Sequence, residues 1–588
     1  MKFENKSFYY LNNIMIDLNK KNAFSWRKIV IKNNILVLEA LDDFWMPREK
    51  YFYFCKIGNK IIFPKFIENN KYDFITLYGL IEKGRIFLFE IPLEIVTISK
   101  ILYFYISYLD VNIEIFPSLG KYTHIPNINN GYYIFENFII KYIYNRLIIY
   151  PYNKNLEIEF EKIYCSELYK YKKYYIIKLR RKYFKNRNKL KQNKRPENWI
   201  ISDGLDRAGG NGEYFFRYLK MKKPKGVKPF YVILKNCPDY KRLKKLGNIL
   251  DVNSYKYKNI FLESKKIISS IYNFGIYNPY KKDQIYIRDI INFDAIFFQN
   301  SILKDDLSKY INKFDKNFNL IVTSSKSEYK VILKSKYGYD KNNVILTGMP
   351  RYDNLQRLKR IINLEKKIII IPDKFKLIKF LEFYEELIND KRLLFNMKKK
   401  NFTGILCLES QTINFRPNEL FSIIEKCDYQ NLTLTSSLLI TDNSNIFFDF
   451  GYMRKPVIYT HFDYNVYRRN SYEKGYFDYK KDGFGPICKD IKCIINEIIF
   501  EINNKCVIRK KYLEKIQKFF AFYDEQNSQR IFDEISKLNY KYIKQPNHSI
   551  FFYFVFLMSI ISYGFIKFYN ILNWKKNGEI YVYFDYKI

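Results

Sequence analysis

The chain has 588 residues, which is too long for one hydrophobic core and predicts several folding units. Its hydrophobic content of 48%, with 56 Tyr and 52 Phe, excludes a chain that is disordered throughout. The formal charge of +41 points toward anionic partners. However, Lys, Asn, Ile and Tyr are enriched together, as in A/T-rich genes, so only local clusters of charge are informative.

Cysteine and histidine are used sparingly. There are eight Cys and three His, with no C-x-x-C pair and no paired His, so a zinc site is not expected. The N-terminal sequence has no apolar stretch behind a basic start, so we expect no secretory signal. The catalytic part is therefore expected to remain in the reducing cytosol, where thiols stay reduced.

Residues 1–150 are predicted to form a β-rich accessory domain, a sandwich of short strands. Tyr51–Ile57 and Lys60–Phe63 flank Gly58-Asn59, the pattern of a two-residue hairpin. Gly84–Ile91 and Tyr132–Phe135 are further expected strands. No catalytic set of residues is visible in this part.

Residues 151–197 are predicted to contain a basic linker helix. Between Leu168 and Pro196 the chain has thirteen Lys or Arg and no acid. A stripe with helical spacing runs along this segment, formed by Leu168, Tyr171, Tyr175, Leu179 and Tyr183. Two interpretations remain open: a helix on an anionic membrane surface, or a solvated linker whose stripe packs on the next domain.

From residue 198 onward, short apolar runs alternate with helical stretches, which predicts parallel sheets covered on both faces. A first Rossmann-like lobe, residues 198–345, has expected strands at Trp199–Ser202, Phe230–Leu234, Lys266–Ser270, Ala295–Phe298, Leu320–Thr323 and Val344–Thr347. A second lobe, residues 346–545, has expected strands at Ile368–Ile371, Gly404–Leu408, Leu438–Thr441 and Pro456–Thr460. The helical stretch Leu513–Leu538 is expected to close the second lobe. The fold class is therefore α/β, with two lobes and a cleft between them.

The C-terminal part contains a hydrophobic segment. Ser549–Ile566 has eighteen residues without a charge, just long enough to cross a bilayer core. A transmembrane or membrane-anchoring helix is expected, with a buried terminal helix or an in-plane anchor as the alternatives. Lysines flank the segment on both sides, so the charges select no orientation.

Four segments together resemble the CDP-glycerol glycerophosphotransferase family, the polymerases of teichoic acid and related polyol-phosphate polymers. The segments are WIISDGLDRAGGNGEYFFRY at 199–218, FQNSILKDDLSKY at 298–310, VILTGMPRYDNL at 344–355 and SLLITDNSN…GYFDYKKDGFGP within 437–486. The resemblance implies a GT-B-like fold. It also implies transfer of glycerol phosphate or ribitol phosphate from a CDP-linked donor to a hydroxyl of a teichoic-acid-like or capsular polymer, with release of CMP.

The candidate donor site follows from chemistry that neutralises phosphate charge. The turn with Thr441, Asp442 and Ser444, where Ser444 is expected to open the next helix, would hold the pyrophosphate through backbone N–H groups. Arg351 is the candidate phosphate clamp, with Asp353 as its orienter. The alternative for Arg351 is an interlobe salt bridge.

The candidate acceptor side is the glycine-rich turn with Gly210, Asn211 and Gly212, which would allow close approach of a substrate. Its alternative is a tight connection with no ligand. Asp442 and Asp449 have an equally simple alternative as structural caps of the neighbouring helix.

The chain departs from the family at the catalytic base. Family members read L-Q-H-G where this chain has F-Q-N-S at 298–301, so Asn300 replaces the histidine thought to be the base, and an amide does not accept a proton near neutral pH. Asp305 and Asp306 are the carboxylate candidates for this role, on the expectation of a raised pKa. His461 is a weaker candidate for a relocated base.

Other departures concern the second lobe. The family's T-D-Y-S-S reads T-D-N-S-N at 441–445, its P-T-W-R reads P-D-K-F at 372–375, and no histidine follows Cys407. These losses motivate an alternative function: a non-catalytic relative that binds nucleotide, polymer or a partner enzyme.

The expected partners are a CDP-polyol donor, a lipid-linked or polymeric polyol-phosphate acceptor and an anionic membrane surface. The expected location is the cytoplasmic face of the cell membrane. No cofactor is expected to be tightly bound, and a divalent cation is left open. A nucleic-acid partner is not expected, because it would rest only on charge and aromatic content.

Overall fold

The computed structural model describes residues 8–11, 14–17, 24–32, 34–42, 51–67, 73–75, 81–83, 85–108, 111–135, 137–192, 196–372, 378–408, 418–424, 427–462, 464–465, 468 and 472–538. Within these residues, no helix combines the length and the apolar composition that crossing a membrane requires. The predicted hydrophobic segment Ser549–Ile566 lies outside the described residues.

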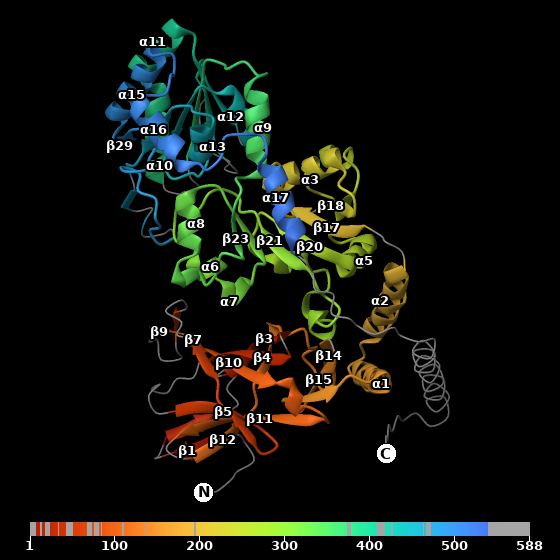
Figure 1. Cartoon of the computed structure of the whole chain (residues 1–588). Helices are drawn as coiled ribbons and strands as arrows, with labels where there is room; N and C mark the ends of the chain where they lie inside the picture. The colour runs from red at the N-terminus through yellow and green to blue at the C-terminus, as the bar shows by residue number, and fades with distance from the viewer. Residues whose placement is uncertain are drawn as a thin grey trace, which may run out of the picture.

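The N-terminal part is a β-sandwich, drawn in red and orange in Figure 1. Its sheets have the orders β13-β3-β4-β10-β7 and β14-β15-β16-β11-β5-β6, and β12 pairs with β11. The strands are β3 (Phe24–Lys32), β4 (Ile35–Asp42), β5 (Tyr51–Ile57), β6 (Lys60–Ile62), β7 (Lys65–Ile67), β10 (Arg85–Pro92), β11 (Lys100–Tyr108), β12 (Val111–Ile115), β13 (Ser118–Tyr122), β14 (Gly131–Phe135), β15 (Phe138–Ile143) and β16 (Arg146–Pro151). Two hairpins accompany them, β1 (Phe8–Leu11) with β2 (Ile14–Asp17) and β8 (Asp73–Ile75) with β9 (Ile81–Lys83).

Alternation of apolar residues along the strands places one core between the two sheets. Trp26 of β3 is 1% exposed, and its ring lies 4.5 Å from that of Phe104 of β11, centroid to centroid. The predicted hairpin at Gly58-Asn59 is confirmed, because β5 and β6 pair antiparallel on either side of it.

Two helices, α1 (Lys154–Lys170) and α2 (Tyr174–Gln192), follow the sandwich, where one basic helix was expected. The break occurs because Lys172 adopts a left-handed φ of 57°. Leu168 is fully buried, in a core shared by the sandwich, these helices and the first lobe. Arg180 of α2 is buried between Glu161 (2.7 Å) and Asp289 of the first lobe (2.7 Å). This part of the predicted stripe therefore packs on neighbouring domains, and membrane binding stays a prediction.

The first lobe is a parallel sheet of order β19-β18-β17-β20-β21-β22-β23, the doubly wound arrangement of a Rossmann unit. Its strands are β17 (Glu197–Ser202), β18 (Val227–Ile233), β19 (Ile249–Asp251), β20 (Ser264–Ser269), β21 (Asp294–Phe297), β22 (Leu320–Thr323) and β23 (Val344–Leu346). Its helices are α3 (Asn211–Lys222), α4 (Asp239–Lys244), α5 (Tyr255–Glu263), α6 (Ser308–Ile311), α7 (Lys313–Lys316) and α8 (Lys326–Ile332). The six predicted strands are confirmed, and β19 was missed.

The second lobe repeats this design with the order β26-β25-β24-β27-β28-β29, again all parallel. Its strands are β24 (Lys367–Ile371), β25 (Thr403–Cys407), β26 (Phe421–Ile424), β27 (Leu438–Thr441), β28 (Val457–Thr460) and β29 (Ile487–Cys488). Its helices are α9 (Pro350–Lys359), α10 (Ile378–Asn389), α11 (Lys391–Lys400), α12 (Tyr429–Thr435), α13 (Phe447–Tyr452), α15 (Ile491–Asn503) and α16 (Lys510–Phe519). The four predicted strands are confirmed, and the short β26 and β29 were missed. The fold class is thus confirmed as α/β, GT-B-like, with two Rossmann-like lobes and a β-rich N-terminal domain.

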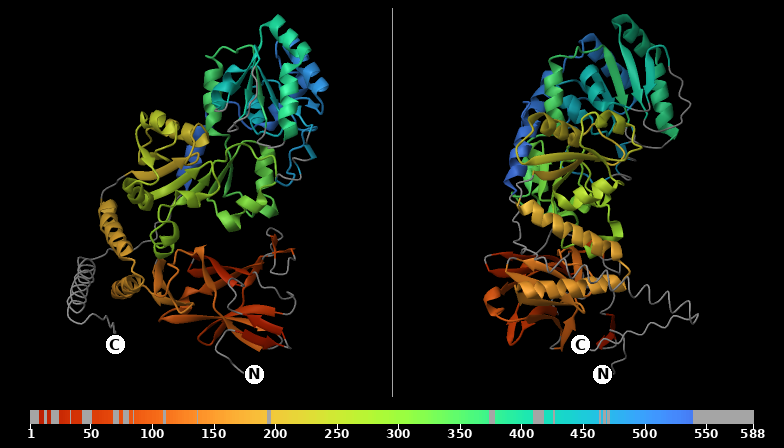
Figure 2. Two further views of the ribbon diagram at one scale, coloured as in Figure 1. Left: turned by 180° about the vertical axis from the view of Figure 1, so that it is seen from behind. Right: turned by 90° about the vertical axis from the view of Figure 1, so that its right-hand side faces the viewer.

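The last described helix, α17 (Asn527–Lys537), returns to the first lobe, contrary to the expectation that this stretch closes the second. Ile531 and Ile535 belong to the core of the first lobe, and the blue helix in Figure 2 runs down from the second lobe onto the first. The physical reason is the apolar stripe of α17, which packs on the same face of the first sheet as α3 and shares its core. The domain boundaries drawn from the sequence stay predictions.

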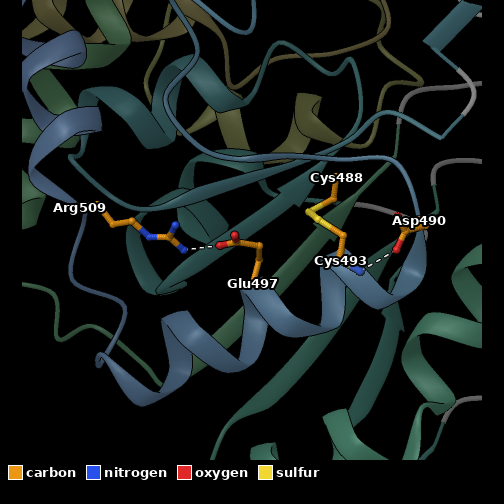
Figure 3. Close-up of a disulfide and its surroundings, with 5 residues drawn as sticks. All are labelled: Cys488, Asp490, Cys493, Glu497 and Arg509. Atoms are coloured by element: carbon orange, nitrogen blue, oxygen red, sulfur yellow. Dashed lines mark hydrogen bonds and ion pairs between the residues drawn. A yellow bond between two sulfur atoms is a disulfide. The ribbon is translucent and has the colours of Figure 1, made fainter.

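A disulfide joins Cys488 of β29 to Cys493 of α15, as Figure 3 shows. Asp490 between them caps α15 and accepts a hydrogen bond from the Cys493 N–H (2.8 Å). Farther along α15, Glu497 pairs with Arg509. The expectation that all thiols are reduced is therefore wrong for this pair, because strand end and helix start place the two cysteines side by side. Cys55, Cys165, Cys237 and Cys506 are buried thiols.

Candidate functional site

The glycine-rich turn before α3 wraps around a buried carboxylate, that of Asp203 at the end of β17. Asp203 accepts hydrogen bonds from the N–H groups of Gly210 (3.0 Å), Gly212 (2.6 Å) and Glu213 (2.9 Å). Burial raises the pKa of Asp203, while the hydrogen bond from Ser270 opposes this. The N–H groups of Gly210 and Gly212 are thus occupied by the chain itself, and close approach of an acceptor to them stays a prediction.

Asn211 connects this turn to the segment that follows β21. Its side-chain Nδ2 donates to the carbonyl of Gln299 (2.8 Å), and its Oδ1 lies 3.5 Å from the backbone N of Arg351. Asn211 is fully buried, whereas the Asn300 side chain is exposed. Three segments far apart in the sequence therefore meet at Asn211, two of them from the first lobe and one from the start of α9.

Arg351 is 7% exposed and lies where α9, α13 and the first lobe meet. Its Nη2 pairs with Asp449 of α13 (2.6 Å), and its Nη1 donates to the carbonyl of Asn300. Although burial opposes the charged form, the Asp449 carboxylate raises the pKa of Arg351. The Nε atom finds no hydrogen-bond partner within the described part of the chain. The ion pair therefore joins two helices of the second lobe, while the Arg351 side chain contacts the first lobe through the Asn300 carbonyl. Among the described residues it is not the interlobe salt bridge of the alternative interpretation, and binding of phosphate by Arg351 stays a prediction.

Asp353 does not contact Arg351 in this structure. The carboxylate that orients Arg351 is that of Asp449. Asp353 accepts hydrogen bonds from the N–H groups of Asn527 (2.9 Å) and Ser528 (2.8 Å), at the start of α17. It also accepts one from the Asn527 side chain (2.8 Å). Because Asp353 lies two residues beyond Arg351 on α9, the two side chains point to different neighbours.

The turn after β27 is buried except at its end. Thr441 is fully buried and donates to the carbonyl of Ile371 (2.6 Å), so its hydroxyl ties β27 to β24. Asp442 accepts from the N–H of Asn443, and Ser444 is half-buried. The helix that follows begins at Phe447 with Ile446 as its N-cap, so Ser444 does not open it. Pyrophosphate binding by this turn stays a prediction.

The carboxylates of Asp305 and Asp306 are both held in ion pairs. Asp305 is 6% exposed and pairs with Lys304 (2.6 Å) and with Arg468 of the second lobe (2.6 Å). Asp306 pairs with Lys336. Burial raises the pKa of Asp306, but the hydrogen bonds from Lys336 and Ser308 and the charge of Lys336 together outweigh burial and lower the pKa below its usual value. The raised pKa expected of a base is therefore not found at Asp306.

His461 follows β28 and is 8% exposed. Its ring stacks on Tyr464 with centroids 4.5 Å apart. Burial lowers its pKa to about 4, so the ring is neutral at pH 7. Its Nε2 finds no hydrogen-bond partner among the described residues.

Within the described residues, no group of three or more His, Cys, Asp or Glu side chains is placed to hold a metal ion. Whether a divalent cation assists the protein stays open, as it was from the sequence.

Comparison with known proteins decides the family. The model of the family described as CDP-Glycerol:Poly(glycerophosphate) glycerophosphotransferase matches residues 183–537, which is more than half of the chain. The chain belongs to this family. The resemblance seen in the four sequence segments is therefore confirmed.

The relatives include the Minor teichoic acid biosynthesis protein GgaB of Bacillus subtilis (strain 168). It is 30% identical over 542 residues, which cover 85% of this chain and 58% of that protein. The Teichoic acid glycerol-phosphate transferase of Staphylococcus aureus (strain NCTC 8325 / PS 47) is 26% identical over 226 residues, 35% of this chain and 57% of that protein. The chain thus spans less than two thirds of the length of these curated relatives.

Among solved structures, the Wall Teichoic Acid Polymerase TagF has a TM-score of 0.43 and 20% identity. The match covers 58% of this chain and 88% of that one. The strand order of the two parallel sheets is sufficient by itself to assign the fold.

In this member of the family, the motif TGMPRYDNL has a structural role at each of three positions. A Cβ on Gly348 would lie 2.0 Å from Asn527 Oδ1, and Asp353 caps the same end of α17. Arg351 joins α13 to the first lobe. The motif therefore holds the two lobes and their connecting helix together.

Sequence reasoning missed two buried carboxylates, Asp203 and Glu328. Glu328 of α8 is fully buried and accepts hydrogen bonds from the Leu303 N–H (2.9 Å) and the Gln299 side chain (3.1 Å). A signal was present, because Ser325-x-x-Glu328 has the pattern of a capping box, and Ser325 does cap α8. Asp203 carried no comparable local signal, since its partners are set by the fold of the following turn.

Proposed function

We propose that this protein transfers glycerol phosphate or ribitol phosphate from a CDP-linked donor to a hydroxyl of a teichoic-acid-like or capsular polymer. In this reaction the hydroxyl oxygen bonds to the phosphorus that carries the polyol, the bond from that phosphorus to the CMP oxygen breaks, and CMP leaves with the electron pair. Membership of the glycerophosphotransferase family supports the donor and the reaction type.

The observation that carries the proposal is the meeting of loops from the carboxyl ends of both sheets, where α/β proteins bind ligands. The segment after β21 contacts Arg351 through the Asn300 carbonyl. It also contacts the turn after β27, because the Ser301 hydroxyl donates to the Asn445 carbonyl (3.4 Å). We place the donor diphosphate and the attacking hydroxyl at this junction.

Catalysis at this junction relies on positioning. Phosphoryl transfer passes through a loose transition state, so the attacking hydroxyl needs little help from a base until late in the reaction. Asn300 offers no base, and the Asp305 carboxylate is held by two cations. We therefore expect turnover to occur without a base, but slowly, because the late removal of the hydroxyl proton has no acceptor side chain.

The reaction is tested by CMP release. Purified protein is incubated with CDP-glycerol or CDP-ribitol and a lipid-linked polyol-phosphate acceptor, and CMP is measured by liquid chromatography. We expect acceptor-dependent CMP. No CMP from either donor, while CDP still binds in calorimetry, would favour the alternative of a non-catalytic relative, which the loss of the base at Asn300 suggests.

Asn300→His is expected to restore a base and raise kcat, since general base catalysis contributes about 10²–10⁴-fold. The exposed position of Asn300 leaves room for the larger ring. Asn300→Ala is the matched control, and its kcat should stay near that of the wild type. Equal rates for the histidine and alanine variants would contradict the placement of the attacking hydroxyl beside residue 300.

We further propose that the protein works at the cytoplasmic face of the cell membrane, on an acceptor that is lipid-linked or polymeric. Support comes from the uncharged run Ser549–Ile566 and the thirteen basic residues between Leu168 and Pro196. Sedimentation of the full chain with anionic vesicles, but not with neutral ones, is the expected result. No sedimentation with either kind of vesicle would count against the proposal.

A further inference from the structure

The Glu328 carboxylate links the loops that follow two neighbouring strands of the first lobe. On the β21 side it accepts from the Leu303 N–H (2.9 Å) and from Gln299 Nε2 (3.1 Å). On the β22 side it accepts from the Ser324 N–H (2.8 Å). Three donors converge on one fully buried carboxylate at the carboxyl end of the sheet.

The loop on the β21 side needs such support because its backbone is strained. Gln299 has a φ of 61°, a left-handed conformation that costs a non-glycine residue about 1 kcal/mol or more. Its side chain is 1% exposed and also donates to the Val322 carbonyl (2.8 Å). Glu328 and Val322 thus hold Gln299 in place from the neighbouring strand.

The same loop makes all three contacts that define the junction of the lobes. Gln299 offers its carbonyl to Asn211, Asn300 offers its carbonyl to Arg351, and Ser301 reaches Asn445. Residues 299–303 are therefore held by Glu328 on one side. On the other side they contact Asn211, Arg351 and Asn445.

We propose that Glu328 is a positioning residue for the transfer reaction, and that its carboxylate fixes residues 299–303 so that position 300 faces the reacting groups. This inference rests on the proposed function. Glu328 itself is fully buried behind Gln299, so it acts through the loop and does not touch the substrate.

The ionisation of Glu328 supplies a signature for this role. Burial raises the pKa of Glu328 to about 7, while the backbone N–H groups of Ser324 and Leu303 and the Gln299 side chain oppose the rise. The titratable groups that interact with it electrostatically are Tyr337, Tyr352 and Tyr476, whose own pKa values are raised by burial, so they stay neutral. Protonation of Glu328 converts one acceptor oxygen into a donor, so the loop loses an anchor as the pH falls through about 7.

The first test compares Glu328→Gln with Ser325→Ala by steady-state kinetics across pH. Ser325→Ala removes the side-chain cap of the same helix, worth about 1 kcal/mol, but keeps the backbone around Glu328. We expect Glu328→Gln to lower kcat about 10–100-fold, as small misplacements do, with little change in donor KM. It should also abolish the loss of activity below pH 7, whereas Ser325→Ala keeps the wild-type kcat and pH profile.

The second test uses hydrogen–deuterium exchange and does not depend on activity. In Glu328→Gln, amides of the 299–303 segment should exchange at least tenfold faster at pH 8, and Ser325→Ala should match the wild type there. Wild-type exchange in this segment that is unaltered by Glu328→Gln would overturn the proposal. If exchange changes as expected but neither the wild type nor any variant releases CMP, Glu328 still anchors residues 299–303 and it is the proposed function that fails.

Discussion

At the residue scale, single buried side chains occupy backbone groups of the type that bind ligands in other proteins. The Asp203 carboxylate occupies the N–H groups of Gly210, Gly212 and Glu213, although such glycine-rich turns before a helix often bind anions. The glycines are required because the carboxylate lies so close to the backbone. At this turn, the close approach predicted for a substrate is made by the chain itself.

Gly212→Ala should destabilise the protein. A Cβ there would lie 2.8 Å from the Ser202 backbone and 2.9 Å from Asp203 Oδ1. The backbone of β17 cannot move enough to relieve this clash. We expect the free energy of unfolding to fall by about 1–3 kcal/mol in urea titration. Gly275→Ala is the control, since its Cβ would meet only the movable side chain of Asn273, at 3.3 Å. Equal stability of the two variants would contradict this explanation.

The pH dependence of stability should report Glu328. Its folded pKa of about 7 lies above its ordinary value of 4.5, so its contribution to stability is complete below pH 4.5 and is lost as the pH rises through about 7. The wild-type Tm should therefore drop between pH 5 and pH 8 relative to that of Glu328→Gln. Parallel Tm curves for the two proteins would show that the carboxyl titrates near its usual pKa.

At the scale of elements, α9 and α17 act as the connection between the lobes. The start of α9 contacts the first lobe at Asn211 and the second lobe at Asp449 through Arg351. Asp353, farther along α9, caps α17, which then packs on the first lobe. The chain thus crosses between the lobes twice, and both crossings meet at one helix.

Asp353→Ala should loosen α17. The substitution leaves the backbone N–H groups of Asn527 and Ser528 buried without an acceptor, at a cost of about 1–3 kcal/mol each. Hydrogen–deuterium exchange should accelerate across residues 527–537. Asp533→Ala, on the exposed side of the same helix, is the control and should leave exchange in its first turn unchanged. Protection retained in Asp353→Ala would mean that Ile531 and Ile535 alone hold the helix.

At the scale of the whole molecule, the sandwich, the helical linker and the first lobe share a core. Figures 1 and 2 show these three parts next to one another. Polar contacts reinforce it. Arg288 of the first lobe donates to the carbonyl of Gly120 (2.9 Å), and Arg27 of β3 donates to that of Lys313 (2.7 Å). The N-terminal domain is therefore held against the first lobe by more than its linker.

Arg180→Ala should destabilise this assembly strongly. It leaves the Glu161 and Asp289 carboxylates buried without their cation, and removal of one member of a buried ion pair costs about 3–5 kcal/mol. Thermal unfolding should show a lower Tm, with earlier loss of the contact between the linker and the first lobe. Lys178→Ala, on the exposed side of α2, is the control. Equal Tm values would indicate that apolar packing alone holds the linker.

The sequence by itself determined the two parallel sheets, because runs such as Leu320–Thr323 and Leu438–Thr441 are apolar, short and separated by helices. It also determined the family, through motifs that are contiguous in the chain. It missed β19 and β29, whose three and two residues are too short to show a pattern. It also missed β26, because its sequence FSII includes an exposed serine and is not a continuous buried run.

Only the tertiary structure decided which side chains meet. The partner of Arg351 is Asp449, 98 residues away, and not Asp353 two residues along the same helix. Likewise α17 packs on the first lobe although it follows the second in the chain. Local patterns report which face of an element is apolar, whereas the choice among distant polar partners depends on how the lobes pack, and that information is not local in the sequence.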